Sequence, residues 1–192
     1  MDSVPKENNM ESPMELLRDD FESSEQEIRI KALKRMNLVA EVIGKEETRN
    51  NLLPFLLAIE QDDDEILFAI ATQLESFVPL IGGPDHASLL MPILENLARV
   101  DETVVREAAI TSICSILTQT GNKCSDSSLS MVKKLSEGDW FTSRASACGL
   151  VSAAYKANVG NSDAQNSIRA IFEQLVKDDT PMVRRAAASN LA

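Results

Sequence analysis

The side chains that could carry out chemistry are few in this sequence, and their spacing does not bring a catalytic set together. A hydrolase or a transferase needs a nucleophile, a base and oxyanion donors that converge on one point. The sequence has a single histidine, His86, which follows Gly-Gly-Pro-Asp at the expected start of a helix and is best explained as a solvated side chain. Gly82 and Gly83 lack the Gly-x-x-x-x-Gly-Lys spacing of a phosphate-binding loop. We therefore predict no catalytic residues and no enzyme activity.

Potential metal ligands gather at residues 62–65, where the sequence is Asp-Asp-Asp-Glu. A calcium-binding loop needs alternating ligands, a glycine in mid-loop and a distant glutamate, and this run does not have that pattern. N-capping and the helix dipole explain carboxylates at the start of a helix. The cysteines Cys114, Cys124 and Cys148 match no metal-ligand spacing. The sequence therefore predicts no metal site, no cofactor and free thiols, which are typical of a reducing compartment.

The overall charge argues against nucleic acid and membranes as partners. The net charge is −11 and the isoelectric point is about 4.6, whereas nucleic-acid binding starts from a basic face. An anionic membrane surface would repel such a chain, and no apolar run is long enough to span a bilayer. Residues 1–13 are too polar and acidic for a signal peptide. We expect a cytoplasmic and nuclear protein that binds basic surfaces of other proteins.

Five short segments of similar residue types recur along the chain. Their last residues are 38, 39, 38 and 40 positions apart, close to the ~40–47-residue period of HEAT and armadillo helical pairs. Each segment begins with Ser or Asp, which predicts a helix N-cap, and two of them also have capping-box spacing (Ser24 with Glu27, Asp62 with Glu65). The segments are Ser24–Arg29, Asp62–Leu67, Asp101–Arg106, Asp139–Arg144 and Asp179–Arg184.

Apolar residues follow each segment at helical spacing, and a second amphipathic stretch precedes it. Three residues past the last position the sequence has Ala or Ile, and seven past it a larger apolar residue, which together define one helix face. Glycines separate the units, at Gly44, Gly82, Gly121 and Gly160. The pattern predicts an outer helix, a short turn and an inner helix in each unit.

We therefore predict an all-α fold, a HEAT-repeat α-solenoid that is a right-handed superhelix of antiparallel helix pairs. Residues 1–12 are expected to be a disordered tail, and residues 13–192 about five repeats that stack into an elongated, curved rod. In the last repeat, Val183, Ala187 and Leu191 form a predicted apolar face that a following repeat would cover. This unit is therefore predicted to be truncated. The predicted repeats are about 13–47, 48–84, 85–123, 124–160 and 161–192.

Several longer motifs resemble the scaffold (A) subunit of type 2A protein phosphatase. The similarity runs from about residue 15 to the last residue, and the two longest motifs are very specific. That family is an extended HEAT-repeat solenoid of fifteen repeats, of which this chain would cover the first five. The motifs are Leu52–Leu56, Gly82–Pro84, Gly138–Arg144, Ser146–Leu150 and Asp178–Ser189.

The resemblance implies a non-catalytic scaffold that helps to assemble a serine/threonine protein phosphatase holoenzyme. Regulatory (B-type) subunits would dock on turns of the N-terminal repeats, and the catalytic subunit on C-terminal repeats that this chain would lack. Periodicity alone leaves another HEAT-repeat adaptor or a nuclear-transport-type receptor open, because a fold does not define a function.

The turns before the inner helices are the predicted binding surface. Trp140 and Phe141 interrupt a mostly polar row, so they either cover the neighbouring turn or act as aromatic anchors for a partner. By resemblance, Pro181 and Arg185 match family positions that contact regulatory subunits. The predicted partner-binding residues are Asp62, Asp63, Asp64, Asp101, Glu102, Thr103, Trp140, Phe141, Asp178, Thr180, Pro181, Met182 and Arg185.

A repeated arginine suggests a structural ladder along the same turns. The column holds Arg29, Arg106, Arg144 and Arg184, and Leu67 interrupts it in the second unit. The resemblance implies that each arginine pairs with an aspartate of a neighbouring turn, with Asp139 as the partner of Arg184. The predicted ladder comprises Arg29, Arg106, Asp139, Arg144, Asp179 and Arg184, whereas Arg185 is predicted to serve binding.

Overall fold

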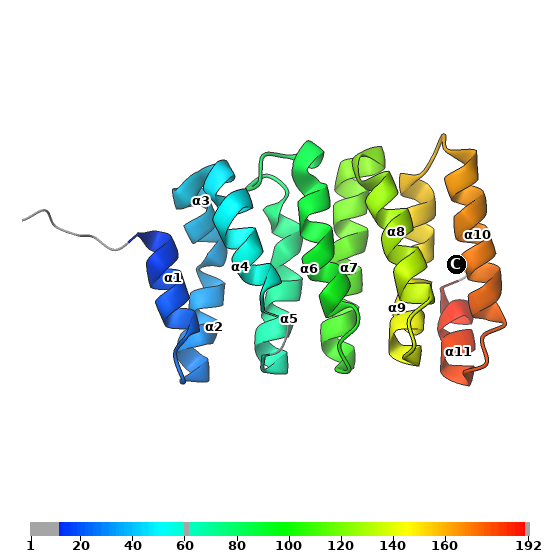
Figure 1. Cartoon of the computed structure of the whole chain (residues 1–192), viewed down its shortest axis with the longest axis horizontal. Helices are drawn as coiled ribbons and strands as arrows, with labels where there is room; N and C mark the ends of the chain where they lie inside the picture. The colour runs from blue at the N-terminus through cyan, green and yellow to red at the C-terminus, as the bar shows by residue number, and fades with distance from the viewer. Residues whose placement is uncertain (1–11, 60–61, 191–192) are drawn as a thin grey trace, which may run out of the picture.

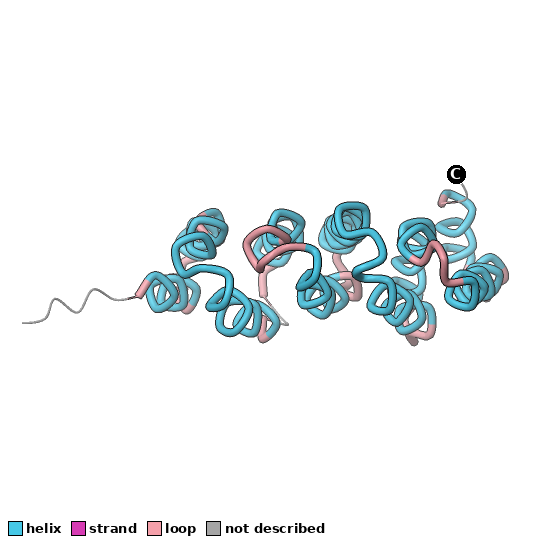
Figure 2. The backbone as a smooth tube through the Cα atoms, turned by 90° about the horizontal axis from the view of Figure 1, so that it is seen from above, coloured by secondary structure: helices cyan, strands magenta, loops and turns pink. Residues whose placement is uncertain are grey.

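The computed structural model describes residues 12–59 and 62–190, and these form five antiparallel helical pairs stacked side by side into an elongated rod (Figure 1). Seen from above, the helices lie in two rows, because the chain crosses between the rows within each pair (Figure 2). We call the first helix of each pair outer and the second inner. No strand occurs among these residues, and none of their helices is long and apolar enough to cross a membrane.

The first two pairs contain the most irregular helices. Outer helix α1 (Pro13–Phe21) is followed by an inner helix in two parts, α2 (Gln26–Lys34) and α3 (Met36–Glu47). The chain turns at Gly44, where φ is 85°, so the last residues of α3 already lead into the second pair. A π-helical turn (Thr48–Leu52) and α4 (Leu53–Leu57) form the second outer helix. Its inner partner is α5 (Asp64–Gln73), extended by a 3₁₀ turn (Leu74–Phe77).

The later pairs have longer inner helices. A 3₁₀ segment (Pro84–Leu90) and α6 (Met91–Leu97) are followed by α7 (Thr103–Thr120). A short 3₁₀ turn (Gly121–Cys124) and α8 (Ser125–Ser136) are followed by α9 (Phe141–Ala157). The fifth pair is α10 (Ser162–Val176) with α11 (Pro181–Ser189).

One continuous apolar core runs between the two rows. The predicted column of small residues is buried in every inner helix, which lets neighbouring helices approach closely: Ala32, Ile70, Ala109, Ala147 and Ala187 are at most 1% exposed. The column four residues later holds Met36, Leu74 and Ile113, also at most 1% exposed, and Val151, which is partly buried against the core. Its last member, Leu191, lies outside the described residues. The periodicity therefore identified the inward face correctly.

Glycine is required at the connection between the second and third pairs. Gly82 and Gly83 have φ values of 104° and 99°, which side chains other than glycine rarely tolerate. A Cβ atom on Gly82 would also lie 3.0 Å from Nη1 of Arg49. That guanidinium donates a hydrogen bond of 2.7 Å to the carbonyl of Ile81, in the turn that follows the inner helix.

The predicted N-caps were wrong by one residue. The inner helices have Glu25, Asp63, Glu102, Trp140 and Thr180 at the N-cap, and the predicted capping boxes at Ser24 and Asp62 do not form. A capping box forms instead at α1, where Ser12 and Glu15 bond each other's backbone N–H. The predicted tail of residues 1–12 otherwise lies outside the described residues. Of the predicted cap residues, Asp62 is engaged by Arg29 through its carboxylate, whereas Asp101, Asp139 and Asp179 contribute backbone carbonyls to the arginines of their own units.

Candidate partner-binding surface

The turns that join outer to inner helices all lie along one long edge of the rod, the lower edge in Figure 1. The glycine-containing connections between pairs lie along the opposite edge. We call the first edge the turn ridge and define it as residues 22–29, 62–67, 98–106, 137–144 and 177–185. All the residues predicted to bind a partner fall on it or in the first turn of the helix that follows.

The predicted binding residues differ in how much they expose. Trp140 is 74% exposed and Met182 is 62% exposed, on the turns of neighbouring pairs. Asp62, Glu102, Phe141, Asp178 and Thr180 are half-buried. The remaining ones are exposed: Asp63, Asp64, Asp101, Thr103, Pro181 and Arg185.

Trp140 and Phe141 have different surroundings although they are adjacent. Phe141, the first residue of α9, is half-buried and packs against the core. Trp140, the N-cap residue, extends into solvent and does not cover a neighbouring turn. Of the two interpretations of this pair, burial therefore suits Phe141 and an accessible anchor suits Trp140.

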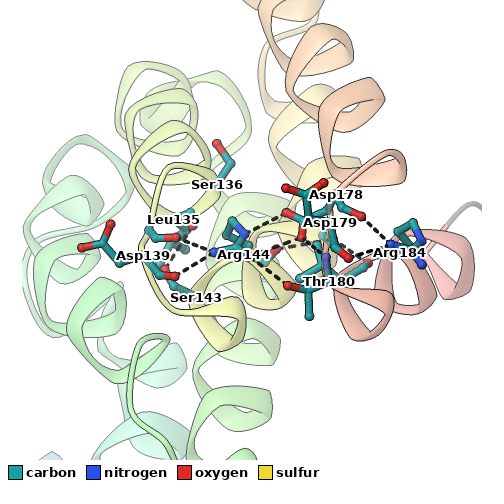
Figure 3. A network of polar contacts seen from close by, with 12 residues as sticks. Leu135, Ser136, Asp139, Ser143, Arg144, Asp178, Asp179, Thr180 and Arg184 are labelled. Carbon is teal, nitrogen blue, oxygen red and sulfur yellow. Dashed lines mark hydrogen bonds and ion pairs between the residues drawn. The ribbon is translucent and has the colours of Figure 1, made fainter.

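Arg144 holds the turns of the fourth and fifth pairs together (Figure 3). Its Nη1 donates to the backbone carbonyls of Gly138 and Asp139, at 2.9 Å each, within its own turn. Its Nε and Nη2 reach the carboxylate of Asp178 at 2.7 and 3.3 Å, and Nη2 also reaches Oγ1 of Thr180 at 3.2 Å. These bonds use all five N–H donors of the guanidinium. Both turns are therefore fixed by one side chain.

The electrostatics of this contact favour the ionised pair. The side chains of Arg144 and Asp178 are 19% and 11% exposed, so solvent screens their attraction only in part. The hydrogen bond from Arg144 lowers the pKa of Asp178 below its ordinary value, and a 2.8 Å bond from the Thr180 backbone N–H acts in the same direction. Asp178 therefore carries its negative charge at neutral pH while it joins two turns.

The direction of the ladder differs from the prediction. Arg184 bonds the backbone carbonyls of Asp178 and Asp179, at 2.6 and 3.0 Å, and not the carboxylate of Asp139. In Figure 3 Asp139 and Arg184 lie on opposite sides of the network. Asp139 and Asp179 contribute backbone oxygens, each to the arginine of its own unit. The inter-repeat pairs run forward along the chain, from an arginine to the turn of the next pair.

Only two junctions between neighbouring pairs are joined in this way among the described residues. Arg29 in α2 pairs with Asp62 at 2.8 Å and with Asp63, which joins the first turn to the second. Arg106 bonds only its own turn, at the carbonyls of Val100 and Asp101 and at Oγ1 of Thr103. Leu67, which replaces the arginine in α5, is buried at 4% exposure. The predicted interruption at Leu67 is therefore present, and a second one follows at Arg106.

Sequence reasoning missed why Gly138 and Ser143 occupy their positions. A Cβ atom on Gly138 would lie 2.6 Å from Oγ and 2.8 Å from Cβ of Ser143, so the turn closes only over glycine. Ser143 stands where the other inner helices have Ile or Val, and its hydroxyl donates to the carbonyl of Leu135 at 3.1 Å. The departure from the apolar column was the available signal, because a buried hydroxyl needs a partner.

The structure also shows the surroundings of the cysteines and of the potential metal ligands. Cys124 and Cys148 are buried, and burial raises the pKa of the Cys148 thiol to about 11, so this thiol is protonated at neutral pH. Within residues 12–59 and 62–190 no group of three or more His, Cys, Asp or Glu side chains is arranged to hold a metal ion.

These features define the class of protein: a HEAT-repeat solenoid with an ordered ridge of turns. No family model matches the chain, but curated relatives do. It is 43% identical over 181 residues to the alpha isoform of the 65 kDa A-type regulatory subunit of serine/threonine-protein phosphatase 2A from Arabidopsis thaliana. It is 45% identical over 180 residues to the human beta isoform and 39% identical over 181 residues to the A-type regulatory subunit of protein phosphatase PP2A from Saccharomyces cerevisiae.

The matches cover 93% of this chain and 28–30% of each of these relatives. Over almost its whole length the chain is similar to A-type, 65 kDa regulatory subunits of type 2A protein phosphatases, and it spans just under a third of the length of the curated relatives that it matches.

Proposed function

We propose that this chain is a non-catalytic scaffold that docks a B-type regulatory subunit through its turn ridge and helps to assemble a serine/threonine phosphatase holoenzyme. The observation that carries the proposal is the exposed Trp140 on a turn held rigid by Arg144. An aromatic side chain loses little entropy when the backbone beneath it is already fixed, and tryptophan and arginine are enriched at interface hot spots.

The neighbouring turn offers complementary features for the same partner. Met182 is exposed at the start of α11, beside Pro181 and three positions before Arg185. A thioether adapts to irregular apolar pockets, and a guanidinium binds a carboxylate through two hydrogen bonds. No contact with the catalytic subunit is proposed for the described residues.

The test is the affinity of the purified chain for a purified B-type regulatory subunit, measured by biolayer interferometry. We expect Trp140→Ala to weaken binding by about 2 kcal/mol or more, roughly 30-fold, as for a hot-spot residue. The matched control is Val159→Ala, because Val159 is 72% exposed on the opposite edge. Unchanged affinity of the Trp140 variant would refute the anchor. Binding of a Ran-type GTPase instead would favour a nuclear-transport-type receptor.

A further inference from the structure

A second accessible apolar surface lies on the inner row, between α5 and α7. Two adjoining hollows of about 290 and 300 Å³ share Phe68 and Val104 in their walls. Phe68 is 38% exposed and Val104 is 54% exposed, so two large apolar side chains from neighbouring inner helices meet solvent at one place. Neither belongs to the apolar columns that form the core.

The walls of this surface are one stripe from each helix. On α5 and the turn that follows, residues 64, 65, 68, 72 and 75 lie at helical spacing, and on α7 residues 104, 107, 108 and 111 do. We call these two stripes the inner groove. At 1.5 Å per helical residue the first stripe is about 17 Å long, which matches about five residues of extended peptide.

The hydroxyl groups in the groove do not demand a polar ligand. Thr72 donates to the carbonyl of Phe68 and Thr111 to that of Glu107, both within their own helices. Ser112 donates to the carbonyl of Ala71 at 2.6 Å. The floor therefore presents methyl groups and the apolar side chains, and the polar character of the groove comes from its rim.

The rim is acidic. Residues 62–120 contain ten carboxylates, two arginines and no lysine, so most of the net negative charge of the chain lies here. One of those arginines, Arg106, uses its Nη groups on its own turn. Five carboxylates border the groove, and none forms an ion pair within the part of the chain that the structure describes: Asp64, Glu65, Glu75, Glu102 and Glu107.

A third hollow, between α7 and the fourth and fifth pairs, differs from the inner groove in its lining. It is larger, about 430 Å³, but small residues such as Ala145 and Gly149 line it and Arg106 borders it. Ile110 packs so closely over Gly149 that a Cβ atom there would lie 3.0 Å from it. That hollow lacks both the exposed large apolar pair and the concentration of carboxylates.

We propose that the inner groove binds a basic linear segment of a partner protein. One large apolar side chain of the segment lies between Phe68 and Val104, and arginines or lysines on both sides of it pair with the acidic rim. The negative charge of the rim favours a basic segment over an acidic one. The apolar floor favours a segment with an apolar side chain over one that has only basic residues. The inner groove begins at the turn ridge, with which it shares residues 64, 65 and 104, and extends away from it along α5 and α7. It does not depend on the function proposed for that ridge.

The test uses a fluorescein-labelled peptide with a central leucine, two arginines on each side and glycine-serine ends, titrated with the intact chain by fluorescence anisotropy. Phe68→Ser is expected to weaken binding roughly tenfold, as expected when one apolar contact is lost. Glu65→Gln with Glu107→Gln is expected to weaken it severalfold and to reduce its dependence on salt. Val104→Ser provides a second apolar variant if the first does not fold, as judged by circular dichroism.

Matched controls define the outcomes that would overturn the proposal. Leu89→Ser removes an apolar side chain of similar exposure (44%) on the outer row, and Glu41→Gln with Glu46→Gln removes two exposed carboxylates near the first pair; both should leave binding unchanged. Equal losses in these controls, or equal binding of a peptide with serine in place of leucine, would show nonspecific charge attraction and overturn the site. Loss of binding in Trp140→Ala would move the peptide to the turn ridge and would also overturn it.

Discussion

The junction between the fourth and fifth pairs and the junction between the second and third use the same repeat position in opposite ways. At this position α9 carries Arg144, which crosses to the next turn and engages Asp178 and Thr180. In α5 the residue is Leu67, which is buried and offers no hydrogen-bond donor. The first junction has a fixed turn and an aspartate whose negative charge is paired with Arg144. The second has carboxylates that remain available beside exposed Phe68 and Val104.

The comparison shows that one side chain per unit decides whether a turn is held by its neighbour. A forward-pairing arginine connects its own turn to the next one, and Arg144 in addition fixes the turn that carries the exposed Trp140. A leucine at the same place packs into the core but donates no hydrogen bond, so it leaves the negative charge of the next turn to be matched from outside. In a solenoid, where each unit contacts only its neighbours, such differences stay local.

The largest expected effect comes from replacing Arg144 by leucine, the residue type that α5 has at this repeat position. Arg144→Leu should lower the free energy of unfolding by about 2–3 kcal/mol, between the values for exposed and buried pairs, because it leaves half-buried Asp178 without a partner. Arg106→Leu should cost less, since Arg106 bonds only its own turn. Urea unfolding of both variants checks this order, and equal losses would contradict the role given to the forward pair.

The adjacent aromatic residues should separate stability from binding. Phe141→Ala is expected to cost about 2 kcal/mol of stability, because part of a ring packed against the core is lost. Trp140→Ala should change the melting temperature little, since its side chain is 74% exposed. At the junction between the second and third pairs the matched position is Thr103. Thr103→Ala should lower stability much less than Phe141→Ala. A marked loss of stability in the Trp140 variant would mean that the indole supports the fold.

Acid should weaken the ordered junction selectively. Because the folded-state pKa of Asp178 is lowered by Arg144, its stabilising contribution is present above the ordinary aspartate pKa of about 3.9 and is lost as pH falls through the lowered value. Asp178→Asn should therefore cost about 1–2 kcal/mol at pH 7 and progressively less in acid. Asp101→Asn, at the second junction, should change stability by less than about 0.5 kcal/mol. A constant difference between wild type and Asp178→Asn from pH 7 to pH 3 would argue against this linkage.

The smallest effects are expected at the two adjacent arginines of α11. Arg184→Ala should lower stability by about 1 kcal/mol, because bonds to the carbonyls of Asp178 and Asp179 are lost. Arg185→Ala should leave unfolding by urea nearly unchanged and reduce affinity for a B-type regulatory subunit. The check is to measure the free energy of unfolding and the affinity for a B-type regulatory subunit for both variants. Equal losses of both quantities in both variants would contradict separate roles for Arg184 and Arg185.

Local signals were enough for the helices and for the repeat. Glycines, apolar columns and the period of 38–40 residues each act over a few positions or recur in register, so the pairs and the inward face followed from the sequence. The same signals placed the N-caps one residue too early. In the second pair the predicted cap, Asp62, is bound instead by Arg29 of the preceding pair, a contact that only the assembled turns create.

The tertiary structure decided what depends on how one pair sits on the next. The forward direction of the Arg144–Asp178 contact, across 34 positions, is set by the offset between stacked pairs, which no column of residues reveals. The same offset places Phe68 beside Val104 and leaves Trp140 in solvent while Phe141, one residue later, packs against the core. The sequence determined which residues recur in each unit; stacking determined which of them meet, because side-chain partners in a solenoid belong to different repeats.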